Sequence, residues 1–347
     1  MITIVVIKIF VLATVSFLTA LFATPVLTHF LYHYKLRKQI RQKNAPHFFQ
    51  LHQHKKGTPA MGGIIIWGTV LVLAVLFSLL PKLTNTTWLP YLNFLSRSET
   101  LLPLGALITA AMIGLADDFL SIIGFGKDKL GVRFRYKIFL YVLIALWGAL
   151  WFYFKLDWDI IHIPFDGDLS LGWLFIPFFV LIITATSFAV NETDGLDGLA
   201  GGVLLTNFAA FGAIAFTAGK YDLASFCAVI AGALIAFLWF NIPPARFFMG
   251  DTGSMALGVV LGIIAFYLKS SLLLPIISLV LVAEAGSVLL QILSKKLRNK
   301  KIFLSSPLHH HLEAKGWPES KIVMRFWIIS MVCSMVGLIL VLLDRTI

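Results

Sequence analysis

Charge is scarce in this chain. Only 13% of its 347 residues are Asp, Glu, Lys or Arg, whereas 59% are hydrophobic. A water-soluble domain rarely has so little charge, so this composition argues against an ordinary soluble enzyme. Repeated apolar runs close to twenty residues long are instead typical of membrane-spanning helices.

Cysteine and the common catalytic motifs are also nearly absent. Cys227 and Cys333 are the only cysteines, and both lie inside apolar segments. This excludes a disulfide framework and a zinc site of the usual cysteine spacing, and it predicts two small core residues. The sequence has no Gly-x-Ser-x-Gly, His-Glu-x-x-His or P-loop motif. It also has no repeat of 20–50 residues and no low-complexity tract, so we expect one integral-membrane unit over 1–347.

The apolar residues are grouped into ten segments. Their approximate ranges are 3–33, 60–80, 100–117, 138–154, 172–190, 201–218, 223–240, 255–268, 272–293 and 323–343. The lengths are those of helices that cross a bilayer. The sequence therefore predicts an all-α polytopic membrane protein with about ten transmembrane helices.

The distribution of Lys and Arg predicts the orientation of these helices. The stretch 34–59 carries seven Lys and Arg and no acid, as expected of a loop that stays in the cytoplasm. If alternate loops follow from there, 21 Lys and Arg lie inside and six outside. Both termini are then outside, and the first segment is an uncleaved span. The net charge of +11 thus indicates sidedness in a membrane, not a nucleic-acid partner.

Three acids fall at predicted helix ends on the cytoplasmic side. Asp117 and Asp118 end the third segment, and Asp251 follows the seventh between Gly250 and Gly253. A charged carboxylate is costly inside a bilayer, so we expect the adjacent pair at the hydrated boundary. Neighbouring side chains on a helix point about 100° apart, so the two could contact different groups. A solvated helix end, and for Asp251 a helix cap, are the structural alternatives.

Two further polar groups are predicted on the same side. In Asn191–Gly202 (NETDGLDGLAGG), Asp194 and Asp197 are three residues apart and would share a face on a helical turn. The glycines there allow close approach of a phosphate or sugar, although a glycine-rich connector is the alternative. His309, His310 and His311 would alternate in direction if extended, a poor transition-metal site but a plausible set of donors for phosphate.

Outside these groups, one acid and one basic stretch stand out. Glu284 is an acid within the ninth apolar segment, which makes it a candidate for function or for a structural hydrogen bond. The basic residues of 295–301 are expected first to contact anionic lipid headgroups and second to attract an anionic substrate. Acids, histidines and lysines around glycine turns favour divalent-metal-assisted chemistry on a pyrophosphate.

The motifs taken together resemble one family. DD at 117–118, NETDGLDGLAGG (191–202), FNIPPARFFMGDTGS (240–254) and SPLHHHLEAKGW (306–317) resemble the phospho-N-acetylmuramoyl-pentapeptide transferase family. This family lies within the polyprenyl-phosphate N-acetylhexosamine-1-phosphate transferase superfamily (glycosyltransferase 4 family). The likeness runs from KKGTPAMGG (55–63) to the last apolar segment.

The resemblance implies an activity, a cofactor and a set of partners. It implies Mg²⁺-dependent transfer of phospho-N-acetylmuramoyl-pentapeptide from UDP to undecaprenyl phosphate, giving UMP and lipid I. This is the first membrane step of peptidoglycan synthesis, and it places the chain in the bacterial cytoplasmic membrane with its active site on the cytoplasmic face. A homodimer is compatible with this reading. Transfer of N-acetylglucosamine-1-phosphate from its UDP-sugar, and secondary transport, stay open as alternatives.

The resemblance also implies roles for individual residues. Asp251 is implied as the metal ligand, and Asp117 and Asp118 with it as the catalytic acids, Asp117 being favoured to handle the lipid phosphate. The residues implied to bind substrate are Lys55, Lys137, Asn191, Asp194, Asp197, Asn241, Phe248, His309, His310 and His311. Leu130 precedes Gly131 where a lysine is common in the family, so Lys137 is the better candidate of the lysines in 127–137.

Overall fold

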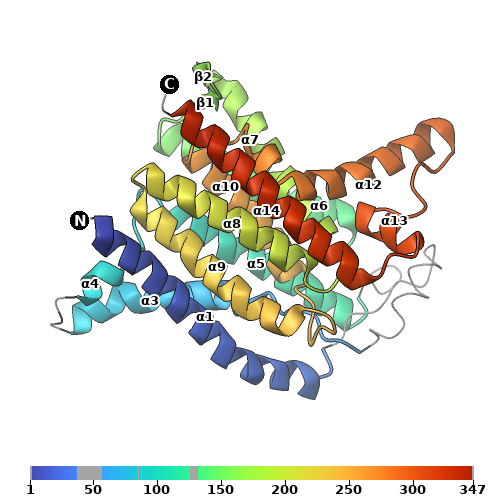
Figure 1. The fold of residues 1–347 in the computed structure, drawn as a ribbon, viewed down its shortest axis with the longest axis horizontal. Helices are drawn as coiled ribbons and strands as arrows, with labels where there is room; N and C mark the ends of the chain where they lie inside the picture. Colours follow the sequence, from blue (N-terminus) through green and yellow to red (C-terminus); the bar gives the residue numbers. More distant parts are fainter. Residues whose placement is uncertain (1, 37–56, 85, 87, 126–131, 346–347) are drawn as a thin grey trace.

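The protein is a bundle of apolar helices, many of which run side by side (Figure 1). The computed structural model describes residues 2–36, 57–84, 86, 88–125 and 132–345. The helices are α1 (Ile2–His33), α3 (Ile64–Leu83), α4 (Leu89–Leu92), α5 (Leu101–Ile122), α6 (Phe134–Leu150), α7 (Phe175–Thr193), α8 (Leu199–Thr217), α9 (Tyr221–Asn241), α10 (Asp251–Tyr267), α11 (Leu274–Ile277), α12 (Leu279–Arg298), α13 (Leu308–Ala314) and α14 (Glu319–Asp344). A π-helical turn (Trp151–Lys155) extends α6, and a 3-10 turn (Gly172–Leu174) precedes α7.

Eight helical stretches among the described residues are long and apolar enough to cross a membrane. They comprise α1, α3, α5, α6 with its π-helical turn, α7, α8, α9 and α14. The prediction of a helical polytopic membrane protein is therefore confirmed. The other two predicted spans correspond to α10, which has 17 residues, and to the region of α11 and α12.

The segment predicted as one span over 272–293 is broken. α11 ends at Ile277, Ser278 leaves helical geometry, and α12 begins at Leu279. The Ser278 hydroxyl is held at the break because it accepts a hydrogen bond from Asn207 Nδ2 at 3.0 Å. α12 then projects from the rest of the bundle (Figure 1) and ends with Lys295, Lys296 and Arg298 in its last turn.

α10 is the centre of the core. All of its residues are buried, and it packs chiefly against α5 and α7. Small residues permit this contact: a Cβ on Gly258 would lie 2.6 Å from Ser187 Cα of α7. Because its first residue is Asp251, this packing fixes the position of one predicted site residue.

A short β-hairpin interrupts the all-α pattern. β1 (Ile160–Ile163) pairs antiparallel with β2 (Gly167–Ser170), and Ile163 lies opposite Gly167. The turn requires a positive φ at Phe165 (66°) and at Gly167 (100°), and Asp-Gly is a common hairpin pair. The all-α prediction from the sequence missed these two strands.

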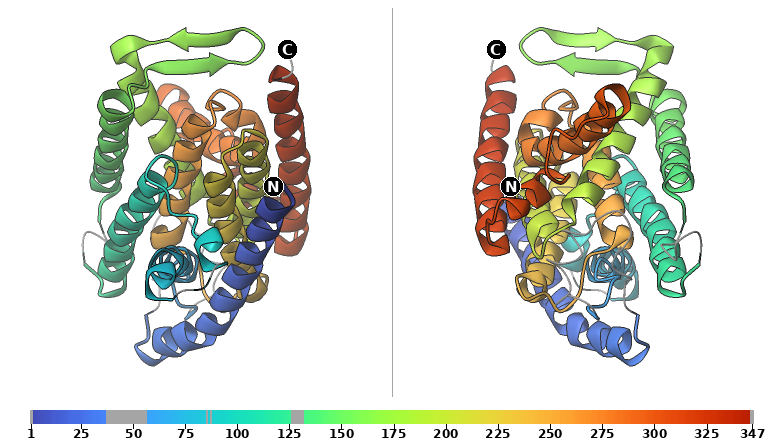
Figure 2. Two further views of the ribbon diagram at one scale, coloured as in Figure 1. Left: turned by 90° about the vertical axis from the view of Figure 1, so that its left-hand side faces the viewer. Right: turned by 90° about the vertical axis from the view of Figure 1, so that its right-hand side faces the viewer.

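The hairpin is fastened to the end of the bundle, beside the C-terminus (Figure 2). The His162 ring lies between two acids, with Nδ1 2.7 Å from Asp168 Oδ1 and Nε2 2.6 Å from Asp344 Oδ2. Lys269 Nζ donates to Asp168 Oδ2 at 2.5 Å. These four residues, which we call the hairpin clasp, connect β1 and β2 with the end of α14 and with Lys269, two residues after the end of α10.

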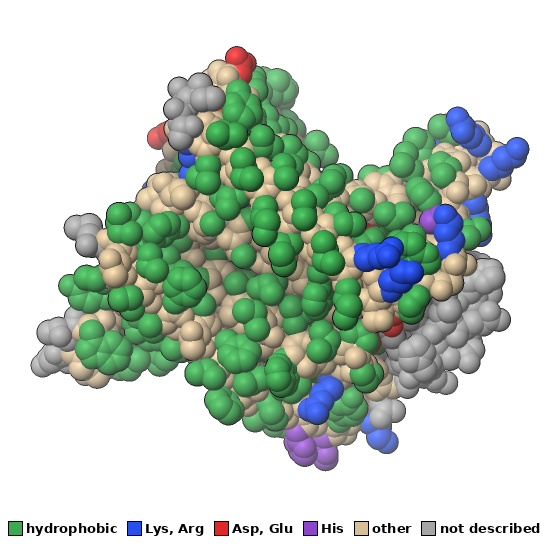
Figure 3. All heavy atoms as spheres, in the orientation of Figure 1, with side chains coloured by type: hydrophobic (Ala, Val, Ile, Leu, Met, Phe, Trp, Pro, Cys, Tyr) green, Lys and Arg blue, Asp and Glu red, His purple; other side chains and the backbone are tan. Residues whose placement is uncertain are grey.

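Charge is distributed unevenly over the surface. Lys and Arg gather on the side where α12 ends and α14 begins, away from both termini (Figures 1 and 3). Acidic side chains are visible at the hairpin end, and a further one lies beside the basic group (Figure 3). The predicted orientation in the membrane stays a prediction.

Candidate active site

Asp117 and Asp118 lie in the last turns of α5. The helix continues to Ile122, about one turn beyond the predicted end. Both side chains are therefore enclosed by protein, with residue exposures of 5% and 1%, and the expectation of a hydrated helix end is wrong. They point in different directions, as expected: Asp117 Oδ1 accepts from Val132 N at 2.7 Å, and Asp118 Oδ2 accepts from Thr252 N at 3.1 Å.

Asp251 opens α10 after a left-handed residue. Gly250 has a φ of 75°, which a residue with a side chain rarely adopts. The backbone that follows packs closely against α5 at Gly114 and against the start of α3 at Gly63. A Cβ on Gly114 would lie 2.4 Å from the Asp251 carbonyl oxygen, and one on Gly63 would lie 2.4 Å from Gly253 Cα. Close backbone contact thus brings Asp251 to the end of α5.

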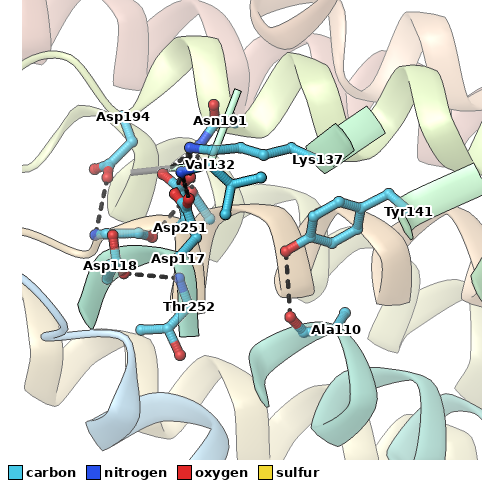
Figure 4. A network of polar contacts seen from close by, with 12 residues as sticks. Ala110, Asp117, Asp118, Val132, Lys137, Tyr141, Asn191, Asp194, Asp251 and Thr252 are labelled. Atoms are coloured by element: carbon cyan, nitrogen blue, oxygen red, sulfur yellow. Dashed lines mark hydrogen bonds and ion pairs between the residues drawn. The ribbon is translucent and has the colours of Figure 1, made fainter. Parts of the chain in front are cut away.

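Lys137 of α6 bridges acids from two other helices (Figure 4). Its Nζ lies 2.6 Å from Asp251 Oδ2 and also forms an ion pair with Asp117 Oδ2. Asp117, Asp118 and Asp251, which we call the acid triad, each place a carboxylate oxygen within 4.8 Å of the others. The predicted convergence of these acids is therefore observed. Lys55, which was also predicted to bind substrate, lies outside the described residues.

Asn191 and Asp194 extend the site from the end of α7. Asn191 Nδ2 lies 3.1 Å from both Asp251 Oδ1 and Ser254 Oγ, and donates to them. Asp194 Oδ2 accepts from Gly250 N at 3.1 Å. The two side chains thus orient the first turn of α10 and its acid (Figure 4).

Asp197, Asn241 and Phe248 surround the turn between α9 and α10. Asp197 Oδ2 accepts from Ala245 N at 3.0 Å. The Asn241 carboxamide accepts from Gly198 N at 2.9 Å and donates to the Phe247 carbonyl oxygen at 2.7 Å. Phe248 is half-buried. The described contacts of Asp197 and Asn241 hold the turn together, and the predicted roles of all three in substrate binding stay predictions.

The three histidines lie on a helix. They form the first turn of α13, so the extended, alternating arrangement considered from the sequence is wrong. His309 is fully buried, with Nδ1 2.8 Å from Glu284 Oε2, and His310 Nδ1 lies 2.6 Å from Glu313 Oε2. His311 Nδ1 accepts from Leu304 N at 3.1 Å. Partial burial and, to a smaller degree, the Lys315 charge lower the pKa of His311.

The structure adds site residues that the sequence did not single out. Thr252 donates its backbone N–H to Asp118 and its hydroxyl to the Ala111 carbonyl oxygen at 2.8 Å, which ties α10 to α5. Glu319 Oε1 accepts from Asp197 N at 2.7 Å. Thr252 could have been suspected because it follows Asp251 in the GDTGS motif. Glu319 has no comparable local signal.

The acid triad has the donor set of a divalent-cation site. Three buried carboxylates lie together, and the Lys137 ammonium pairs with two of them, those of Asp117 and Asp251. Buried charges are stable only when they are paired or bound to a metal. Carboxylate oxygens are also the ligands that Mg²⁺ and Ca²⁺ prefer. The residues present therefore fit a hard divalent ion, and the meeting of three buried carboxylates is the observation that supports it.

Comparison with known proteins gives a consistent result over nearly the whole chain. The profile described as Glycosyl transferase family 4 matches residues 100–269. A protein of Chloroflexus aggregans is 39% identical over 96% of this chain and 89% of its own length. Proteins of Clostridium novyi (38% identical, 93% and 94% covered) and Geobacillus thermodenitrificans (36%, 93% and 95%) are similar too. All three are named phospho-N-acetylmuramoyl-pentapeptide-transferase.

Proposed function

The chain belongs to the phospho-N-acetylmuramoyl-pentapeptide-transferase family, and from this premise we propose the following reaction. It transfers phospho-N-acetylmuramoyl-pentapeptide from UDP to undecaprenyl phosphate, and it releases UMP and lipid I. This is the first membrane step of peptidoglycan synthesis. The observation that supports this chemistry is the meeting of the acid triad and Lys137, which come from α5, α6 and α10.

The reaction is a displacement at phosphorus. An oxygen of the polyprenyl phosphate attacks the β-phosphorus of the UDP-sugar, and the bond from that phosphorus to the bridging oxygen breaks. UMP leaves with the bonding electrons. Asp117 orients the lipid phosphate and accepts its proton when it carries one, and the Lys137 ammonium offsets the charge of the phosphates.

We propose Mg²⁺ as the cofactor. Asp251 would be its ligand, with Asp117 and Asp118 close enough to share it. When bound, the ion supplies a Lewis acid that stabilises negative charge on phosphate oxygens. Asn191 and the first turn of α10 set the direction of the Asp251 carboxylate before any substrate arrives.

The polar turn and the histidines are proposed to contact the nucleotide sugar. Asp194 and Asp197 already hold the turn between α9 and α10. Asn241 and Phe248 lie on that turn or at its start, where an aromatic face suits a flat uracil base. Lys55, His310 and His311 complete the polar surroundings in this proposal.

The proposed setting is the bacterial cytoplasmic membrane. The chain acts as one transferase unit with both termini outside, about ten transmembrane segments and the acid triad toward the cytoplasm. A homodimer is compatible with this arrangement, and nucleic acid is not among the proposed partners.

Labelling with an impermeant thiol reagent tests the orientation. A cysteine at exposed Ser320 should react only from the cytoplasmic side and one at exposed Ser170 only from outside. The reverse pattern would contradict the topology.

The reaction is tested with purified protein in vesicles. UDP-N-acetylmuramoyl-pentapeptide and undecaprenyl phosphate should give UMP and a lipid-linked sugar, and removal of divalent ions by EDTA should stop both. UDP-N-acetylglucosamine should give neither product, because the three relatives described above are named for the muramoyl-pentapeptide substrate. Product from UDP-N-acetylglucosamine alone would favour the first alternative. Uptake of intact substrate without UMP release would favour transport.

A further inference from the structure

Glu284 is an acid buried inside the protein that the proposed reaction does not use. It lies on α12 with no exposed surface. Among the described residues, its carboxylate is hydrogen-bonded to the fully buried His309 at the start of α13. Glu284 Oε2 lies 2.8 Å from His309 Nδ1, and Glu284 Oε1 accepts from the His309 backbone N–H at 3.2 Å. An acid enclosed in this way is stabilised by these contacts, so the pair forms as a unit.

The contacts of His309 indicate which ring nitrogen carries the proton. Nδ1 faces a carboxylate oxygen, which can only accept when ionised. Nε2 is buried and has no hydrogen-bond partner among the described residues. An N–H at Nε2 would therefore be a buried donor without an acceptor, which is unfavourable. The proton belongs on Nδ1, and Glu284 selects this tautomer.

The other edge of the ring supports the turn that carries Asp194 and Asp197. A Cβ on Gly195 would lie only 2.2 Å from His309 Nε2, so the turn rests directly on the imidazole. Asp194 accepts from Gly250 N, immediately before the metal-site acid, and Asp197 accepts from Ala245 N. The path from Glu284 to the acid triad is thus continuous: carboxylate, imidazole, glycine turn and the start of α10.

We infer that Glu284 is a positioning residue. It acts through His309 to hold the turn 194–198 in the position that nucleotide-sugar binding requires. The inference rests on the proposed function for its kinetic consequences. The geometric link between Glu284, His309 and Gly195 stands apart from the identity of the substrate. It also explains why glycine occupies position 195, since any side chain there would displace the ring.

A double-variant cycle tests the link. Gly195→Ala should reduce kcat/KM for the UDP-sugar about 100-fold, because the new methyl group pushes the turn away from the ring. In a His309→Ala background the space is free, so the same change should cost much less than it does alone. Thermal unfolding of the four proteins in detergent should show the same coupling. Equal losses in both backgrounds, in kinetics and in unfolding, would overturn the inference.

Substitutions of Glu284 test positioning against simple packing. Glu284→Gln keeps an acceptor for His309 and should retain most of kcat. Glu284→Leu fills similar space without one, and it should raise KM for the UDP-sugar and lower kcat about 10-fold or more. Gln291→Ala is the matched control on α12, since Gln291 is buried and bonds Ile302 and Phe303 instead of His309. If Leu and Gln variants behaved alike, the tautomer would have no role.

A spectroscopic measurement determines the tautomer of His309 independently of any transferase activity. In protein with ¹⁵N-labelled histidine, the signal that disappears in His309→Gln should show Nδ1 protonated and Nε2 unprotonated. In Glu284→Leu that signal should change. A protonated Nε2 in the unaltered protein would overturn the inference. Wild-type protein that transfers no sugar would instead refute the proposed function, and the unfolding cycle and this spectrum would still decide the inference.

Discussion

The protein carries two clusters of carboxylates and cations at different ends, and they are built differently. In the acid triad, three carboxylates lie close together and Lys137 pairs with two of them; these paired side chains, of Asp117 and Asp251, are only 7% and 6% exposed. In the hairpin clasp, two acids meet Lys269 and His162, and the Asp168 side chain is 38% exposed. The carboxylates of the first cluster are all buried, whereas the second includes a partly exposed carboxylate, that of Asp168, which pairs with a lysine.

This difference distinguishes a candidate reactive site from a structural contact. A balanced, partly hydrated ion pair contributes little energy and serves to hold two segments together. Buried acids with too few cations are unfavourable unless another positive group joins them, which is what a metal-dependent phosphoryl-transfer site provides. Each prediction below alters one of the two clusters and names the effect that distinguishes a reactive site from a structural one.

The largest effect is expected from Asp251→Asn. The amide keeps the size of the side chain but removes a negative ligand and the ion pair with Lys137. Transfer should fall about 10³-fold, measured as UMP release from folded protein in vesicles. Asp166→Asn, an exposed acid next to the hairpin turn, is the control and should leave the rate unchanged. Full Mg²⁺-dependent activity in Asp251→Asn would remove the acid triad from the mechanism.

Lys137→Met should come next. It leaves buried acids without their cation, so affinity for the anionic substrates should fall and transfer should drop about 100-fold. Excess Mg²⁺ should restore part of the activity, because a second divalent ion can replace some of the lost charge. Arg135→Met removes a cation from an exposed position two residues earlier. Its rate should stay near that of the unaltered protein; a comparable loss would point to a general charge effect.

Asp344→Asn should affect stability and not transfer. The variant weakens the acceptor for His162 Nε2 and for Phe165 N, which lies 2.5 Å from Asp344 Oδ1. The free energy of unfolding should fall by about 1–2 kcal/mol, seen as a lower midpoint of thermal unfolding in detergent. Ser170→Ala, which removes an exposed hydrogen bond to Asp159, should change it less. A large loss of transfer would show that the two clusters are coupled.

A still smaller effect should appear in the pH dependence of stability. Hydrogen bonds from Lys269 and then His162 lower the pKa of Asp168 from its ordinary value of 3.8. The Asp168 carboxylate therefore binds a proton more readily in the unfolded chain than in the folded protein. Its contribution to the free energy of unfolding is present above about pH 4, and it is lost as the pH falls through the pKa of Asp168 in the folded protein. Unfolding midpoints of wild type and Asp168→Asn should differ at pH 6 and approach each other as the pH is lowered below the ordinary Asp value of 3.8. A constant difference would contradict the assignment.

Much of the fold was accessible from the sequence because the bilayer restricts it. Apolar runs and basic loops predicted the helices and the separation of charge, and the motifs predicted which acids converge. What could not be predicted depends on contacts distant in sequence. The break at Ser278 depends on Asn207 of another helix, and the hairpin on Asp344. The burial of the acids at the end of α5 depends on partners from other helices, such as the Lys137 ammonium and the Thr252 N–H, which stabilise carboxylates enclosed by protein.

α10 is enclosed by other helices along its whole length. Its length therefore does not have to match the hydrocarbon thickness of the bilayer, as the length of a lipid-facing helix does. Its 17 residues rise about 25 Å, less than the hydrocarbon thickness of about 30 Å. A lipid-facing helix of that length would suffer hydrophobic mismatch, but α10 touches only protein, so its acidic end can lie below the headgroup level. Acyl-chain length should therefore strain the outer helices before it disturbs the position of Asp251, and transfer rates in vesicles of moderately different thickness should stay similar.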